Sequence, residues 1–102
     1  MIKMTAFYKK PADIEAFEKH YWETHVPLNN KMPGLLKTTF TRFTSAPLGE
    51  PRFYLQCDMF FENQDSLNNA MKSSEGKAAG KDLMTFAADL VTLIIGEEIP
   101  AK

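Results

Sequence analysis

The hydrophobic residues between positions 12 and 33 repeat with the period of an α-helix. Placed at about 100° per residue, the positions on one face are mostly apolar and include a histidine: Ile14, Phe17, Tyr21 and His25. The positions on the opposite side are charged: Glu15, Lys19 and Glu23. The helix should end near Val26, because Pro27 disfavours helical backbone at the residue before it. The pattern therefore predicts one amphipathic helix with His25 on its buried face.

The rest of the chain alternates between β-favouring and helical patterns. Strands are predicted at residues 2–8, 35–44, 53–62 and within 89–98. A short helix to about residue 71 and a longer one over about 73–88 lie between the last two strands. The order β-α-β-β-α-β predicts an α+β, ferredoxin-like fold, in which both helices cover one side of a four-stranded antiparallel sheet. We expect residues 1–102 to form a single domain.

The predicted strands are apolar on both sides of their alternation. In the third strand one side is formed by Phe53, Leu55, Cys57, Met59 and Phe61, while Tyr54 and Phe60 fall on the other. Two helices cannot cover both sides of such a sheet, and an exposed apolar patch marks an interface. We therefore expect a homodimer that packs through the open face of the sheet, with a barrel-like interior.

Composition excludes several classes of partner. Twelve basic and thirteen acidic residues give a formal charge of −1, whereas nucleic-acid binding needs a clustered basic face. No apolar run reaches the roughly 18–20 residues of a membrane span, and the start of the chain lacks a signal-peptide pattern. The single cysteine, Cys57, excludes an internal disulfide. We expect a cytoplasmic protein that contacts neither nucleic acid nor membrane.

His25 is the first candidate for chemistry. An imidazole beside a pocket can act as general acid or base, because its ordinary pKa lies near neutrality. The alternative is a structural histidine that bonds backbone carbonyls at a helix end. His20 lies five residues earlier, about 140° around a regular helix, which is poor geometry for a shared metal ion. We expect His20 at the surface and no metal or other cofactor.

Further candidates are polar or titratable residues within apolar segments. Tyr8 closes the first strand where the helix begins, and Tyr21 neighbours His25 by helical spacing, so both are predicted to line the same pocket. Asp58 and Arg42 are charged residues within apolar strands, where they could pair with each other, orient a substrate or stabilise a developing oxyanion. The alternative is a structural ion pair, or strand ends that reach solvent. We expect Cys57 to be an unreactive residue of the hydrophobic core.

Four segments together resemble the EthD family of the dimeric α/β barrel superfamily: FYKKP (7–11), FEKHYWETHVPL (17–28), MPGL (32–35) and SSEGKAAGKDLMTFAADL (73–90). The resemblance implies the ferredoxin-like fold and the dimer. The family is named for a component of an ethyl tert-butyl ether degradation gene cluster that includes a cytochrome P450 system. Related barrels include polyketide cyclases, muconolactone isomerases, cofactor-free monooxygenases and haem-handling enzymes, so one fold carries many chemistries.

Two functional hypotheses follow. The first is a small catabolic protein, either a cofactor-free enzyme or an auxiliary oxidoreductase component. It would act on a small hydrophobic or aromatic molecule, with His25 as acid or base and with Tyr8, Tyr21, Asp58 and Arg42 binding the substrate. The alternative is a non-catalytic dimer that binds such a molecule for a separate enzyme.

Overall fold

The computed structural model describes all of residues 1–102. Its strands are β1 (Ile2–Tyr8), β2 (Lys37–Arg42), β3 (Leu55–Phe61) and β4 (Val91–Glu97). Its helices are α1 (Ile14–His20), the π-helix η1 (Tyr21–His25), α2 (Val26–Asn29), α3 (Gln64–Lys72) and α4 (Ser74–Ala87). None of these helices is long and apolar enough to cross a membrane.

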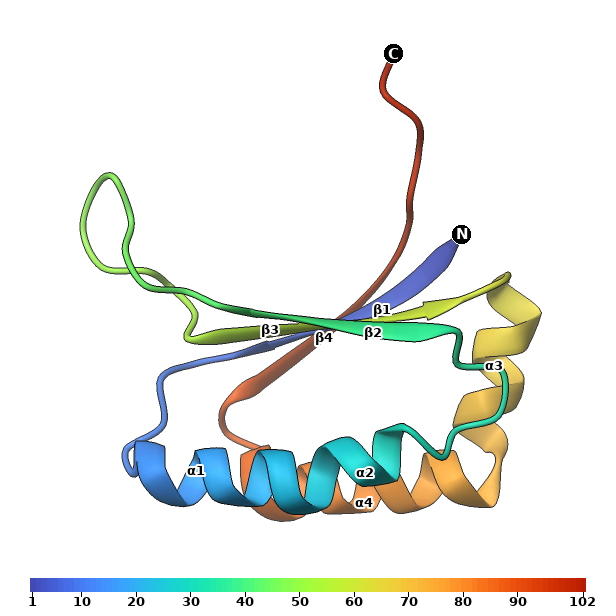
Figure 1. The fold of residues 1–102 in the computed structure, drawn as a ribbon, viewed down its shortest axis with the longest axis horizontal. Coiled ribbons are helices and arrows are strands. Elements are labelled where there is room, and N and C mark those ends of the chain that lie inside the picture. Colours follow the sequence, from blue (N-terminus) through green and yellow to red (C-terminus); the bar gives the residue numbers. More distant parts are fainter.

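The strands form one antiparallel sheet in the order β2-β3-β1-β4. Figure 1 shows the sheet as one layer and α1, α2 and α4 as a second layer on one side of it, with α3 standing at one end of both. The two termini lie on the side of the sheet away from the helices. The predicted ferredoxin-like α+β fold is confirmed.

Side-chain caps set the starts of the helices. The Asp13 carboxylate accepts a hydrogen bond of 3.0 Å from the backbone N–H of Ala16 and begins α1. Ser73 does the same for α4, accepting from the N–H of Gly76 at 3.0 Å. These bonds satisfy N–H groups that have no partner within the first turn of a helix.

The sequence predicts that the helix with both histidines ends near Val26. In the structure it continues to Asn29. Its middle turn, η1, is π-helical, and the Val26 N–H bonds to the carbonyl of Tyr21, five residues earlier. Proline has no N–H and crowds the carbonyl four residues before it in a regular helix. The widened turn lies directly before Pro27, so the chain stays helical past the proline.

The face of the sheet toward the helices holds the core. Alternate residues of β1 and β3 point into it, and they pair across the two strands as Met4 with Met59, Ala6 with Cys57, and Tyr8 with Leu55. Phe17 and Tyr21 pack on them from the helical layer, as do residues of α3 and α4. We call this the covered face.

The other side of the sheet, the open face, is not the apolar surface that the sequence pattern predicted. Its centre is Asp58, which accepts hydrogen bonds from Thr5 and Gln56 and lies 3.5 Å from the Lys3 ammonium. Phe60 is buried beneath the ammonium groups of Lys3 and Lys37, which lie 5.7 and 4.6 Å from its ring centre. The open face is therefore a polar network with a few apolar side chains.

The prediction failed at the start of β3, where the alternation breaks. The alternation of β3 predicts Tyr54 on the side of Phe60, which is the open face, and Phe53 on the side of Leu55, which is the covered face. Instead Phe53 packs on Phe7 at 4.9 Å between ring centres, on the open side. Tyr54 turns toward α1, where its hydroxyl donates to the Glu18 carboxylate. Tyr54 precedes the regular strand, which begins at Leu55, so the two-residue period does not extend to it.

Candidate functional site

A cavity of about 90 Å³ lies between the covered face and the helices. Most of its lining is apolar and comes from β1, β3, β4, α3, α4 and the loop after α2: Met4, Met59, Leu93, Met71, Leu83 and Met32. The polar side chains at its wall are few: Tyr8, His25 and Asn29, with the thiol of Cys57. An apolar hollow with a small number of polar groups is the usual form of a small-molecule site.

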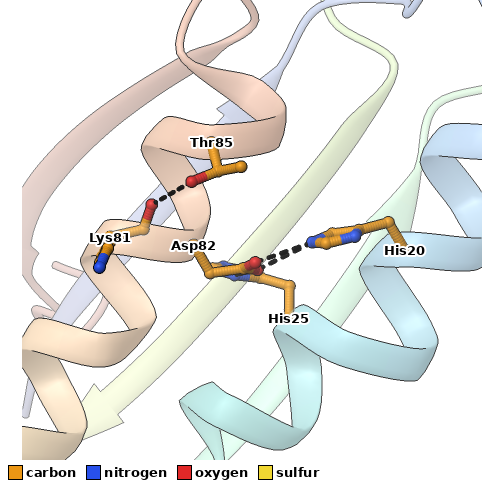
Figure 2. A network of polar contacts seen from close by, with 5 residues as sticks. All are labelled: His20, His25, Lys81, Asp82 and Thr85. Carbon is orange, nitrogen blue, oxygen red and sulfur yellow. Dashed lines mark hydrogen bonds and ion pairs between the residues drawn. The ribbon is translucent and has the colours of Figure 1, made fainter.

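His25, at the end of η1, is held at this cavity by an acidic residue of the neighbouring helix. Its side chain is 3% exposed, and its Nδ1 lies 3.0 Å from Oδ2 of Asp82 on α4. A carboxylate only accepts hydrogen bonds, so Nδ1 carries the proton. The lone pair of the neutral ring is then on Nε2. Figure 2 shows Asp82 reaching from α4 toward the two histidines.

His20 meets the same carboxylate. Its Nε2 lies 2.9 and 3.0 Å from the two oxygens of Asp82 (Figure 2). Its ring packs on Phe86 with 4.6 Å between the ring centres. The side chain is 34% exposed, so His20 lies at the surface as expected, but the sequence did not predict its contact with Asp82. The reason is η1: a π-helix bonds residues five apart, and it brings positions 20 and 25 toward one side of the helix.

Burial sets the protonation of His25. Loss of water around the ring lowers its pKa, and the nearby His20 acts in the same direction, while the hydrogen bond and charge of Asp82 oppose the shift. Burial prevails, so the neutral imidazole is the form present at pH 7. The site therefore holds a base, oriented by a carboxylate.

No group of three or more His, Cys, Asp and Glu side chains in the chain is arranged to hold a metal ion. Asp82 instead accepts hydrogen bonds directly from the two imidazoles.

Tyr8 of β1 and Cys57 of β3 line the cavity with His25, whereas Tyr21, also predicted to line the pocket, packs against Tyr8 and is not part of the cavity wall. The rings of Tyr8 and Tyr21 meet edge to face at 5.4 Å, and Tyr21 lies 5.9 Å from the His25 ring. Burial raises the pKa of both tyrosines and raises that of Cys57 to about 11. All three groups thus keep their protons at neutral pH, and Cys57 fits the prediction of an unreactive core thiol.

The structure separates Asp58 and Arg42 from the cavity and from each other. Arg42 pairs with Leu55 across β2 and β3 and so faces the helices, whereas Asp58 lies on the open face. The guanidinium of Arg42 instead binds the Glu18 carboxylate at 2.8 Å, at an exposed position. The predicted pairing of Asp58 with Arg42 is wrong, because their positions in the register point to opposite faces.

Asp82 is the residue of the site that the sequence did not reveal. A signal was present: Asp82 lies three residues after Ala79 and four before Phe86, within the apolar stripe of α4. Counting at 3.6 residues per turn could not identify His20 and His25 as its partners, because they lie on the same side of their helix only through the π-helical turn η1.

Fold and site together define a ferredoxin-like α+β protein with a histidine–carboxylate pair beside an apolar cavity. The chain belongs to the EthD family: the model of the EthD domain matches residues 9–89. An EthD family protein from Bacillus halodurans, solved by crystallography, is 49% identical in sequence to this chain. The two structures superpose with a TM-score of 0.94 over 97% of this chain and 99% of that one.

Two further similar proteins are informative. An uncharacterized 11.0 kDa protein in the thcB-thcC intergenic region of Rhodococcus erythropolis is 32% identical over 98 residues, which are 96% of this chain and 95% of that protein. A dimeric ferredoxin-like protein of unknown function from Thermobifida fusca is 12% identical, with a TM-score of 0.68 over 93% of this chain and 88% of that one. At that identity the likeness concerns the fold alone.

Proposed function

We propose that this protein is a small acid–base enzyme that works without a cofactor on a compact hydrophobic or aromatic molecule, with His25 as the base. The observation that carries the proposal is the position of His25, which lines the apolar cavity while Asp82 holds its Nδ1 at 3.0 Å. A carboxylate on one ring nitrogen fixes the tautomer and leaves the other nitrogen to take a proton. A base placed in this way contributes about 10²–10⁴-fold to a rate.

The cavity limits the size of the ligand. Its volume of about 90 Å³ exceeds the roughly 30 Å³ share of one liquid water and is smaller than the roughly 150 Å³ cavity that binds benzene. Four methionines in its wall can change rotamer at low cost, because thioether chains are unbranched and flexible. Phenol is therefore the appropriate probe of binding, and a larger ring system enters when these methionines change rotamer.

Binding is tested with phenol, followed by NMR of the ¹⁵N-labelled His25 ring and the methionine methyl groups. The phenol hydroxyl should donate to Nε2, so saturable binding should shift that nitrogen. His25→Asn keeps a side-chain N–H for Asp82 and removes Nε2, and it should weaken binding about fivefold. Thr85→Ala is the control, because Thr85 is exposed on α4, its hydroxyl bonds the Lys81 carbonyl, and it does not line the cavity. If His25→Asn binds phenol as tightly as the parent protein does, the result argues against the proposal.

Catalysis is tested with 1,2-benzisoxazole, whose ring opens when a base removes the proton on C3. The C–H electron pair forms the nitrile, the N–O bond breaks, and 2-cyanophenolate leaves, so no oxidant or metal is needed. The protein should exceed the rate of free imidazole by about 10²-fold, and His25→Asn should abolish that excess. The rate should rise with pH as the His25 imidazolium loses its proton.

A non-catalytic binding or accessory protein is the second candidate, and the predominantly apolar wall favours it. Ten of the fourteen lining residues are hydrophobic, so the cavity offers little besides His25 to direct a reaction. This function predicts saturable phenol binding with no turnover of benzisoxazole beyond that of the His25→Asn variant.

We also infer that the protein is a homodimer that packs through the open face. Ile94 supports this, because it lies on the open face, opposite Thr5, and is 53% exposed in the single chain. Several proteins of the same fold, including that of Thermobifida fusca, are described as dimeric. Ile94→Lys should give a monomer in light scattering at micromolar concentration, whereas Met84→Lys on α4, equally exposed at 54%, should not. A monomeric parent protein would overturn the inference.

A further inference from the structure

The side-chain amide of Asn29 borders the cavity and has no hydrogen-bond partner in the chain. Asn29 is the last residue of α2 and is only 5% exposed, yet it lines the cavity. None of the side-chain hydrogen bonds of the protein involves its amide. The side-chain atoms that are fully covered and unpaired belong to Tyr21 and Thr38 instead. The amide of Asn29 is therefore buried, unpaired and open to the space of the cavity.

Asn29 and His25 stand on the same face of their helix. They are four residues apart, the spacing at which side chains of a helix are neighbours, and both line the cavity. The Nδ1 of His25 is occupied by Asp82, so the free ring nitrogen is Nε2, an acceptor. The amide of Asn29 supplies two N–H donors and one carbonyl oxygen. The wall of the cavity thus presents a base and a hydrogen-bond donor side by side.

The residues at which the cavity meets the surface are apolar. Met71 of α3 and Leu93 of β4 line it and are 43% and 42% exposed, and Gly80 of α4, which also lines it, is exposed as well. His25 and Asn29 are buried, so their polar groups lie away from this mouth. A ligand that fits such a cavity has an apolar body and one polar end, which points inward.

We propose that the cavity takes a small carbonyl compound whose oxygen accepts a hydrogen bond from the Asn29 amide, while the Nε2 of His25 removes a proton from the adjacent carbon. This rests on the proposed function and specifies its substrate class. The C–H electron pair becomes the C=C bond of an enolate, and the carbonyl π pair moves onto oxygen. The imidazolium of His25 then returns the proton to carbon, so the step is an isomerisation or a proton exchange without an external reagent.

An amide N–H beside the base is suited to this step because the carbonyl oxygen gains negative charge as the proton leaves. Fixed donors aimed at a developing oxyanion, asparagine amides among them, stabilise the transition state more than the ground state. In a wall that is mostly apolar such a donor strengthens further, because little water competes with it. A hydrocarbon of the same shape would leave the amide of Asn29 unpaired and should bind less well.

The binding test uses cyclopentanone labelled with ¹³C at the carbonyl, beside methylenecyclopentane, which has the same shape and no oxygen. Cyclopentanone should bind about tenfold more tightly, and its carbonyl resonance should move downfield when bound. Asn29→Leu, which has a similar volume and no donor, should remove most of that shift and weaken cyclopentanone binding about fivefold. Its affinity for methylenecyclopentane should not fall, which shows that the cavity is intact. Asn30→Leu is the matched control, because Asn30 is exposed and does not line the cavity.

The reaction test follows deuterium entering the α-carbons of cyclopentanone in D₂O. Exchange above the uncatalysed rate should be lost in His25→Asn and reduced about 10²-fold in Asn29→Leu, which removes the donor to the developing oxyanion. Asn29→Ala removes the same amide with a smaller side chain that favours the helix, so it should lower the exchange as well. Asn30→Leu should exchange deuterium at the rate of the parent protein.

The outcomes separate this inference from the proposed function. If the Asn29 variants leave the carbonyl shift and the exchange unchanged, a fixed water occupies the amide or another group holds the oxygen, and the inference is overturned. If cyclopentanone neither binds nor exchanges while phenol and benzisoxazole respond to His25→Asn, the carbonyl inference fails and the proposed function stands. If none of these probes binds, both proposals fail.

Discussion

The two faces of the sheet bury polar groups in opposite ways. On the open face Asp58 is buried, yet it is surrounded by Thr5, Gln56 and Lys3, so its charge is satisfied within the sheet. On the covered face the Tyr21 hydroxyl is buried with no partner. Both arrangements come from strands or helices with similar mixtures of apolar and polar residues. On the open face the buried polar side chains hydrogen-bond one another, whereas on the covered face the Tyr21 hydroxyl has no hydrogen-bond partner.

This difference teaches where a ligand should be sought. A satisfied network adds stability or specificity to an interface but offers nothing further to a small molecule. An apolar cavity with the Nε2 of His25 at its wall can still take a ligand. The covered face therefore carries the candidate site, and the open face is left for a second subunit. The following predictions test this contrast, from the largest expected effect to the smallest.

The largest effect is expected from glycines placed on the two sides of the sheet. A Cβ at Gly76, at the start of α4, would lie 2.0 Å from the carbonyl oxygen of Ala70, so backbone must move. Gly76→Ala should destabilise the protein by more than about 4 kcal/mol or prevent folding. Gly96→Ala on the open side meets nothing within 4 Å and should stay within about 0.5 kcal/mol. Urea unfolding measures both; equal costs would show that the helical layer is loosely packed.

The adjacent phenylalanines of β3 compare the two faces directly. Phe61 is fully buried in the core cluster, whereas Phe60 is covered on the open face by two lysine side chains. Phe61→Ala should cost about 3–5 kcal/mol. Phe60→Ala should cost less than half as much, since flexible lysine chains can close over the gap. Unfolding monitored by circular dichroism at fixed protein concentration tests this, and equal losses would contradict it.

Tyr21→Phe should change stability in the unusual direction. It removes a hydroxyl that is buried without a partner and keeps the ring that packs on Tyr8 and Phe17. We expect the ligand-free protein to gain about 1 kcal/mol of unfolding free energy. Tyr54→Phe is the control, because the Tyr54 hydroxyl donates to Glu18, and it should lose stability or leave it unchanged. Destabilisation by Tyr21→Phe would mean that its hydroxyl is satisfied in solution.

The smallest effect concerns pH. The pKa of His25 is lower in the folded protein than its ordinary value of 6.5 because of burial, so the folded state binds fewer protons than the unfolded chain. Its contribution to stability is present above pH 6.5 and is lost as the pH falls through the folded pKa. Urea midpoints should fall from pH 7.5 to 5.5 in the parent and fall less in His25→Asn. The same decline in both would show that His25 is not buried as a neutral ring.

Much of the fold followed from periodicity. The four strands and the long helices appeared as apolar patterns of period 2 and 3.6, which depend on local geometry alone. The same counting placed His25 on the buried side of its helix, where it is found. It failed at Tyr54, just outside the regular strand, and at His20, where the helix changes its hydrogen-bond ladder. Both failures arose where local geometry departed from the ideal period.

The sequence by itself determined the order of the elements and the buried position of His25, because side-chain hydrophobicity acts along each element independently of the others. The tertiary structure alone decided which groups meet. Asp82 hydrogen-bonds His25, which lies 57 residues earlier in the sequence. Asp58 and Arg42 lie on opposite faces of the sheet because of the register between β2 and β3. Such pairings depend on register, on the π-turn and on the packing of two layers, none of which a local pattern encodes.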